Sequence, residues 1–211
     1  MPLQNRVTPW GQLEAATARG AWMGNRGILH DDQKRIVAPW RTKAWITCRL
    51  DYKGVHRVVF SPHTWTELFF LDEATAFAAG HRPCSFCRHT RFDEFKTAWG
   101  AANHPEVAAR ALRVAQIDAQ LHAERALRGG GKVTWTESYG KLPPGTFIAL
   151  DGAPCLIWNG ALWPWTHTGY HPARNTPGAA AMVTVLTPRS IVAAFRCGLT
   201  PQVHASATNV S

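Results

Sequence analysis

The sequence has no apolar run near the length of about 18 residues that a membrane-spanning helix needs. Its first residues also lack the basic stretch and following apolar run of a secretory leader. Acidic residues are few, 14 Asp and Glu in 211 residues, and there are only three tyrosines. We therefore expect a cytoplasmic protein with no membrane partner and a predominantly basic surface.

Cysteine is scarce as well, and the chain has five: Cys48, Cys84, Cys87, Cys155 and Cys197. An odd number at uneven spacing does not suit a disulfide framework, and a chain of this length can build a core without such cross-links. We expect reduced thiols or a metal site, with Cys155 and Cys197 acting as small buried hydrophobic side chains.

Basic residues, by contrast, are abundant and gather near one end of the sequence. The net charge is +9, and residues 1–60 hold ten Lys and Arg against four Asp and Glu. Four of the ten tryptophans lie in the same segment, and basic side chains interleaved with aromatic rings favour a polyanion with stackable bases. A solvated basic surface that only keeps the protein soluble is the alternative.

We predict nucleic acid, and DNA in particular, as the partner. Glycine-flanked arginines on loops suit phosphate binding, because backbone amides and a guanidinium can approach the anion together. The candidate contacts are Arg6, Arg19, Asn25, Arg26, Arg41, Lys43, Arg49, Arg82 and Arg88.

The first part of the chain predicts short elements followed by one long helix. Turn formers dominate residues 1–40, which we interpret as loop with short ordered pieces. We then expect a hairpin of residues 45–52 and 55–60, a strand over 66–70, and a helix over 73–79 that is capped by Asp72 or the residue before it and ended by Gly80. A helix over 91–99 follows, and then a long helix from Asn103 or His104, with Pro105 at its first position, to about residue 127.

Three glycines, residues 129–131, predict a hinge before a β-rich end. The expected strands cover 133–135, 145–150, 154–158, 161–165 and 182–186, and a final helix over 189–197 begins at Thr187-Pro188 and ends at Gly198. The predicted class is α+β, with a zinc-knuckle module, one long helix, and a small antiparallel meander or barrel closed by the last helix. The three parts are 1–100, 101–128 and 132–211.

Cys84 and Cys87 form a Cys-x-x-Cys directly after the helix that Gly80 ends. This spacing is typical of half a zinc site, in which two thiolates on a tight turn bind the metal. Arg82 and Arg88 would favour the thiolates, which helps metal binding and redox chemistry alike. A redox motif and a turn without metal are the alternatives, although the βαβ context of a thioredoxin-like motif is absent.

The stretch from Glu67 to Arg88, ELFFLDEATAFAAGHRPCSFCR, resembles the second half of the zinc-binding N-terminal domain of the adaptive-response protein Ada. The segment Trp45-Ile-Thr-Cys48-Arg49 resembles the part of that domain that carries its acceptor cysteine. The resemblance covers about 45 residues and implies that Cys48, Cys84 and Cys87 bind zinc. It also implies that zinc-bound Cys48 takes a methyl group from a DNA phosphotriester, with Arg49 beside it.

The chain departs from the Ada pattern at the fourth ligand, because Asp51-Tyr52 stand where a further cysteine is expected. His56, His63, His81 or His89 would have to complete the site, and we favour His63 and His56 because they lie between the two halves. The predicted metal ligands are therefore Cys48, Cys84, Cys87 and His63.

A second candidate for chemistry lies on the expected long helix, where Asp118 and His122 stand four residues apart. At this spacing the two side chains can touch, and the carboxylate would orient the imidazole for general acid-base work. A partly buried ion pair is the structural alternative, and Glu67 is a weaker candidate for the same role.

The preferred hypothesis is a zinc-containing nucleic-acid-binding protein of DNA repair or modification. The alternatives are a hydrolase or lyase that uses Asp118 and His122 on a nucleic acid or nucleotide, with structural zinc, and a non-catalytic binding module.

Overall fold

The structure is a computed structural model and describes residues 1–54 and 58–208. In this part the elements are β1 (Gln4–Val7), β2 (Leu13–Ala15), β3 (Trp22–Asn25), β4 (Ile46–Cys48), β5 (Leu68–Phe70), α1 (Glu73–Ala78), β6 (Arg82–Pro83), α2 (His89–Asn103), α3 (Val114–Arg125), β7 (Trp135–Ser138), a 3-10 turn (Tyr139–Lys141), β8 (Phe147–Leu150), β9 (Ala153–Trp158), β10 (Ala161–Thr166), β11 (Gly169–Tyr170), β12 (Met182–Val185) and α4 (Arg189–Arg196).

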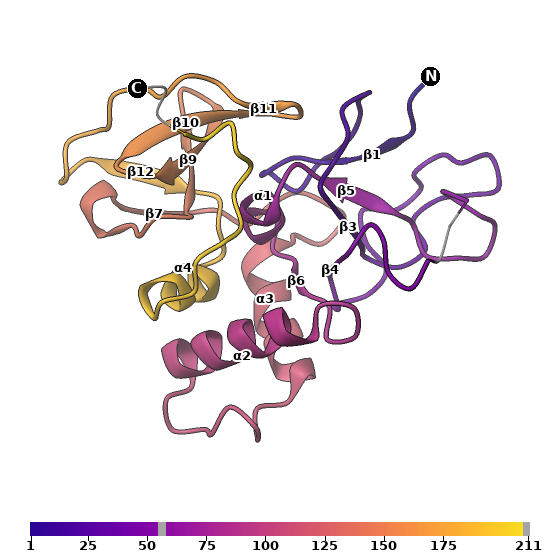
Figure 1. The fold of residues 1–211 in the computed structure, drawn as a ribbon, viewed down its shortest axis with the longest axis horizontal. Helices are drawn as coiled ribbons and strands as arrows, with labels where there is room; N and C mark the ends of the chain where they lie inside the picture. Colours follow the sequence, from indigo (N-terminus) through magenta and orange to yellow (C-terminus); the bar gives the residue numbers. More distant parts are fainter. Residues whose placement is uncertain (55–57, 209–211) are drawn as a thin grey trace.

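The described residues form an α+β fold with two six-stranded sheets and four helices, which confirms the predicted class. The first sheet has the order β2-β1-β5-β3-β4-β6, and the second has the order β11-β10-β9-β8-β12-β7. Figure 1 shows the sheets on either side of α1, with α2, α3 and α4 below them. The second sheet is open, with β11 and β7 at its edges, so the predicted barrel is not formed.

Helix α1 lies where three hydrophobic clusters meet. Phe77 packs in the cluster of the helices, Ala74 and Ala78 pack against the second sheet, and Ala76 and Ala79 pack against the first. All six residues of α1 are buried. Small alanine side chains let neighbouring elements approach the helix from every side, which explains the alanine-rich sequence.

The short ordered pieces expected in residues 1–40 are β1, β2 and β3 of the first sheet, whose three or four residues are too few to show a period. The predicted hairpin, by contrast, is not found: β4 ends at Cys48 and pairs with β3 and β6, while residues 58–60 form no strand. Residues 55–57 lie outside the described part.

The long helix beginning near residue 103 is a further error. Helix α2 continues to Asn103, and α3 begins only at Val114. A proline disfavours helical backbone in the residue before it, so Pro105 ends α2 at His104, whose φ and ψ are −142° and 61°.

The β-rich end agrees closely with its prediction. Asp151 and Asn159 adopt positive φ at the two predicted hairpin turns, and β8, β9 and β10 pair in antiparallel order. Helix α4 ends at Arg196 with Cys197 as its C-cap, directly before Gly198 as expected, but its N-cap is Pro188 and not Thr187. The Thr187 hydroxyl does not cap it and instead accepts a hydrogen bond from the Phe147 amide at 2.9 Å.

Cys155 is buried as expected, whereas Cys197 is exposed, and all five cysteines are free. Among the described residues, no helix is both long and apolar enough to cross a membrane.

Candidate metal centre

The end of α1 sets the position of the Cys-x-x-Cys. Asp72 caps the helix by accepting the Thr75 amide at 2.8 Å, as its sequence position predicts. At the other end, the Gly80 amide donates to Phe77 and the His81 amide donates to Ala76, which is a Schellman motif with Gly80 at a φ of +87°. The chain then reverses and enters β6.

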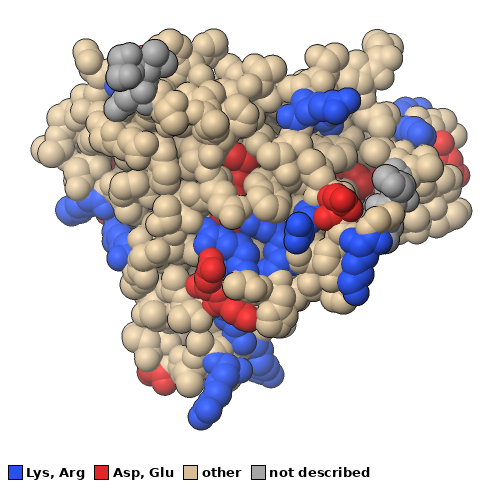
Figure 2. Space-filling view, viewed as in Figure 1, with Lys and Arg blue, Asp and Glu red and all other residues tan. Residues whose placement is uncertain are grey.

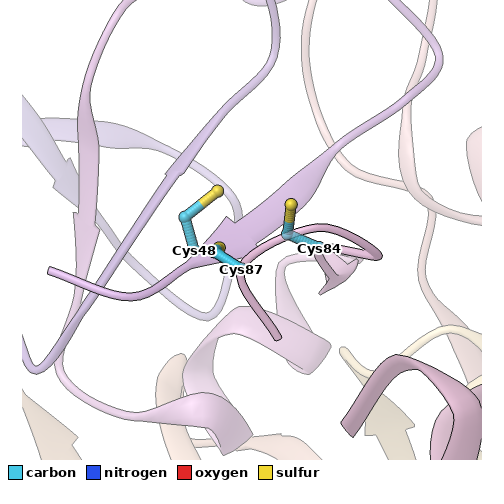
Figure 3. A group of neighbouring side chains, drawn as sticks. All are labelled: Cys48, Cys84 and Cys87. Atoms are coloured by element: carbon cyan, nitrogen blue, oxygen red, sulfur yellow. The ribbon is translucent and has the colours of Figure 1, made fainter. Parts of the chain in front are cut away.

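The register of the first sheet brings Cys48 to the same place. Strands β4 and β6 run parallel, with Thr47 beside Pro83, and the Cys84 amide donates to the Thr47 carbonyl at 2.9 Å. The residues that follow these neighbours are Cys48 and Cys84. Figure 3 shows the cysteine side chains gathered from two segments far apart in the sequence.

Two buried arginines hold these segments in place. Arg82 makes a bidentate pair with Asp118 of α3, at 2.7 and 2.8 Å. Arg88 binds Glu73 at 2.5 Å and donates to the Thr47 hydroxyl at 3.0 Å, directly before Cys48. The two side chains therefore tie both halves of the cysteine cluster to the helices.

The sulfur atoms of Cys48, Cys84 and Cys87 all lie within 4.8 Å of one another, which makes them a possible metal site. Zinc–sulfur bonds of about 2.3 Å in a tetrahedral arrangement place the sulfurs about 3.8 Å apart, so the donor set suits zinc with small adjustments. Three thiolates leave the fourth tetrahedral position to another ligand.

Hydrogen bonds within the cluster concentrate negative charge on one sulfur. The hydrogen bond from Cys48 lowers the pKa of the Cys84 thiol to about 5, while the pKa of Cys48 is raised. The Phe86 amide also donates to the Cys84 sulfur at 3.4 Å. The cluster therefore holds a thiolate near neutral pH, and thiolate is the form that binds metal.

The cysteines lie at a cavity of about 330 Å³ with aromatic and basic side chains on its walls. Tyr52 and Phe86 meet edge to face at 5.3 Å, and the Lys53 ammonium lies over both rings, 5.5 and 5.7 Å from their centroids. Phe86 is 71% exposed. Sequence reasoning missed these three residues, although an exposed phenylalanine inside the Cys-x-x-Cys is a signal that could have been used.

The structure does not bring the predicted fourth ligand to the cysteines. His63 is exposed and does not belong to the metal-ligand cluster, which among the described residues contains the three cysteines alone. His81 is fully buried and accepts a hydrogen bond from Arg26 at 3.2 Å, and His89 pairs with Asp93 on the surface. His56 lies outside the described residues.

The predicted nucleic-acid contacts divide by burial. Arg19, Arg41, Lys43 and Arg49 are exposed; Arg6 and Asn25 are half-buried; Arg26, Arg82 and Arg88 are buried. The guanidiniums of Arg82 and Arg88, two of the predicted phosphate contacts, instead form ion pairs with Asp118 and Glu73.

Of the remaining contacts, Arg49 and Asn25 line the cavity of the cysteines, and Arg26 lines a different cavity. Arg6 lies over the Phe69 ring. On the face of the molecule that Figure 2 shows, Lys and Arg side chains lie in separate groups, with acidic side chains among them.

The predicted pair of Asp118 and His122 is also not formed. Both carboxylate oxygens of Asp118 bind Arg82, so the buried ion pair expected as the alternative exists, but with a different partner. His122 packs edge-on against Trp40, with the ring centroids 4.4 Å apart. Glu67 is 2% exposed and accepts the Phe60 amide at 2.9 Å, which leaves it no acid-base role at the surface.

Comparison with known proteins does not identify the chain: no family model, curated protein or solved structure matches it.

Proposed function

We propose that Cys48, Cys84 and Cys87 bind one zinc ion and that this centre serves a nucleic-acid-binding protein of DNA repair or modification. The carrying observation is the arrangement of three converging sulfurs at the wall of a cavity. Structural zinc sites are closed by four protein ligands, whereas sites that perform chemistry keep one position open. Three cysteines facing a cavity correspond to the second kind.

The cavity walls support nucleic acid as the partner. Exposed Phe86 offers a ring face on which a base can stack, and such stacking contributes about 1–3 kcal/mol per base. Arg49 and Lys53, both exposed, lie on the same walls and can hold the adjoining phosphates. Aromatic and cationic groups thus lie beside the sulfurs, as binding of a strand requires.

Bound zinc would keep all three thiols deprotonated at neutral pH. In the Ada-like reading, the Cys48 sulfur attacks the alkyl carbon of an alkylated phosphate. A sulfur–carbon bond forms as the carbon–oxygen bond breaks, and the phosphodiester leaves as an anion. Arg49 lines the cavity with Cys48 and can stabilise that anion.

Metal analysis of the purified protein tests the centre. We expect about one zinc per chain, lost in Cys84→Ser and retained in Cys197→Ser, which changes an exposed cysteine outside the cluster. Absence of zinc from the wild type, or equal loss in both variants, would refute the zinc centre.

Fluorescence anisotropy with single- and double-stranded DNA tests the partner. We expect affinity to fall steeply with salt, and Arg49→Gln to reduce the slope of log K against log salt by about 0.7–0.9. Arg110→Gln, at an exposed site on another segment, is the matched control. Binding that ignores salt, or an equal effect of both variants, would contradict the proposed DNA interface.

Mass spectrometry after incubation with methylphosphotriester DNA tests the transfer. We expect one methyl group in place of a proton on Cys48, and no such change on Cys197. An unmodified Cys48 in protein that contains zinc and binds DNA would exclude the transfer and leave the binding function standing.

A further inference from the structure

A second cavity, of about 510 Å³, lies apart from the cysteines. Its walls include Trp10, Trp40, Trp45, Arg26 and Arg125, which come from the N-terminal segment and the end of α3. A volume of this size is typical of small-molecule sites, which combine apolar walls with a few polar groups.

Arg26 and Arg125 line this cavity without ion pairs, and a third cation, Lys132, lies near both. Arg26 donates to the Gly11 carbonyl at 2.8 Å, Arg125 to the Gly80 carbonyl at 2.5 Å, and the Lys132 ammonium to the Ala78 carbonyl at 2.6 Å. No carboxylate within the described residues forms a salt bridge with any of them. Asp118 and Glu124 are the acids that act on Arg125. Both oxygens of Asp118 bind Arg82, and the oxygens of Glu124 accept hydrogen bonds from Gln120 and Ser190.

The arginines are buried almost completely, which makes this arrangement costly without an anion. Arg26 and Arg125 are each 2% exposed. Burial lowers the pKa of both guanidiniums to about 9, and their mutual repulsion adds to the effect at Arg125. Buried charges in proteins are normally paired, so an unpaired cluster of one sign indicates a missing partner.

Unused hydrogen-bond donors mark the same place. Arg26 Nη2, Arg125 Nε and Trp40 Nε1 are buried and have no acceptor. Arg26 Nη2 lies 3.8 Å from where a Cβ of Gly11 would stand, and Gly11 is a wall residue of the cavity. Buried donors without acceptors are rare in folded proteins, and three at one cavity suit a ligand with several acceptor oxygens.

Aromatic rings give the site its second component. Both guanidiniums stack on the Trp45 ring, with its centroid 4.0 Å from Arg26 Cζ and 4.2 Å from Arg125 Cζ, and this stacking holds both in fixed positions. Trp10 and Trp40 line the cavity as well and leave rings for a planar ligand. The acid on these walls, Glu14, is 2.8 Å from His167 Nε2.

We propose that this cavity binds a phosphate monoester that carries a planar ring, as a nucleoside monophosphate does, with the phosphate at Arg26 and Arg125 and the ring against the tryptophans. The proposal rests on other residues than the zinc centre and does not depend on it. A free nucleotide and the phosphorylated end of a strand share this chemistry, and competition between them separates the two sources.

Quenching of tryptophan fluorescence measures binding directly, with adenosine and guanosine monophosphates, the two nucleosides and inorganic phosphate as probes. We expect saturable quenching by a monophosphate, with affinity at least tenfold higher than for its nucleoside and for inorganic phosphate. No saturable quenching, or equal affinity for the nucleoside or for phosphate alone, would overturn the proposal.

Variants then locate the site in protein that retains its circular dichroism spectrum. Arg125→Met should weaken monophosphate binding at least tenfold, and Arg110→Met, at an exposed position, should leave it unchanged. Trp40→Phe keeps a ring but removes the indole donor and should weaken binding several-fold. The assignment would be refuted if Arg125→Met and Arg110→Met had equal effects. It would also be refuted if the two single variants Trp40→Phe and Arg125→Met both bound the monophosphate as the wild type does.

A competition titration identifies the source of the phosphate. A 5′-phosphorylated oligonucleotide that displaces the monophosphate, while its 5′-hydroxyl counterpart does not, supports a strand end as the ligand. If neither oligonucleotide displaces the bound monophosphate, that result supports a free nucleotide.

Discussion

Asp118 provides the sharpest test of how the cysteine cluster is held. Its carboxylate binds the Arg82 guanidinium through two hydrogen bonds of 2.7 and 2.8 Å, and the two side chains are 9% and 6% exposed. Asp118→Asn keeps the shape but leaves the charge of Arg82 buried without a counterion. Breaking a buried pair in this way destabilises a protein by about 3–5 kcal/mol.

The effect should be large on the scale of the whole protein, since folded domains are stable by about 5–15 kcal/mol. In a chain of this size each kcal/mol lowers Tm by about 2–4 °C, so we expect Asp118→Asn to lower Tm by about 6–20 °C. Urea unfolding followed by circular dichroism, with and without a zinc chelator, gives the free energy apart from metal binding.

Two comparisons make the prediction for Asp118 decisive. Asp93→Asn removes an exposed carboxylate that pairs with His89, and should change the stability by less than about 0.5 kcal/mol. The double variant Arg82→Met with Asp118→Leu removes both charges and should cost less than Asp118→Asn alone. If Asp118→Asn costs no more than Asp93→Asn, the reasoning about Asp118 is refuted.

Three further substitutions test other parts of the fold. Gly80→Ala should destabilise the protein by about 2–4 kcal/mol in urea unfolding, because Gly80 has a positive φ and an added methyl would collide with Arg125. Gly152 also has a positive φ, but a methyl there meets no atom within 4 Å, so Gly152→Ala is the control. Equal losses of stability in the two variants would contradict the role of the collision. Tyr170→Phe removes the hydroxyl that donates to Asp72 at 2.7 Å and should cost about 1–3 kcal/mol in the same assay; unchanged stability would contradict this. Burial lowers the pKa of Lys132 from 10.5 to about 7, so between these pH values the unfolded state binds more protons than the folded state. The free energy of unfolding of the wild type, relative to that of Lys132→Met, should therefore rise with pH across this window. If urea titrations show a difference that does not change with pH, the argument about Lys132 is refuted.

Several features were predictable because their causes lie within a few neighbouring residues. Helix α1 is bounded by Asp72 and Gly80, since a side-chain cap and a left-handed glycine act on the adjacent backbone. The Asp-Gly and Asn-Gly hairpins follow for the same reason. The Cys-x-x-Cys turn after β6 belongs to this group as well.

Local signals failed where partners come from distant segments. Local signals placed Cys48 in a hairpin, which is not formed. Cys48 lies beside Cys84, as the Ada resemblance implied, because β4 pairs in parallel with β6. His63 was chosen as the fourth ligand because it lies between the two halves in the sequence, and this position did not bring it into the cysteine cluster. Where strands from distant parts of the sequence pair, the spacing of residues along the chain does not determine which of them come into contact.

The sequence by itself therefore determined the α+β class, the turn that carries Cys84 and Cys87, and the excess of basic residues near the N-terminus. Only the tertiary structure decided which cations are available. It placed Arg82 and Arg88 in buried ion pairs and left Arg26 buried without one. The physical reason is that the energy of a charge depends on its burial and its partner, and the packing of distant elements determines both.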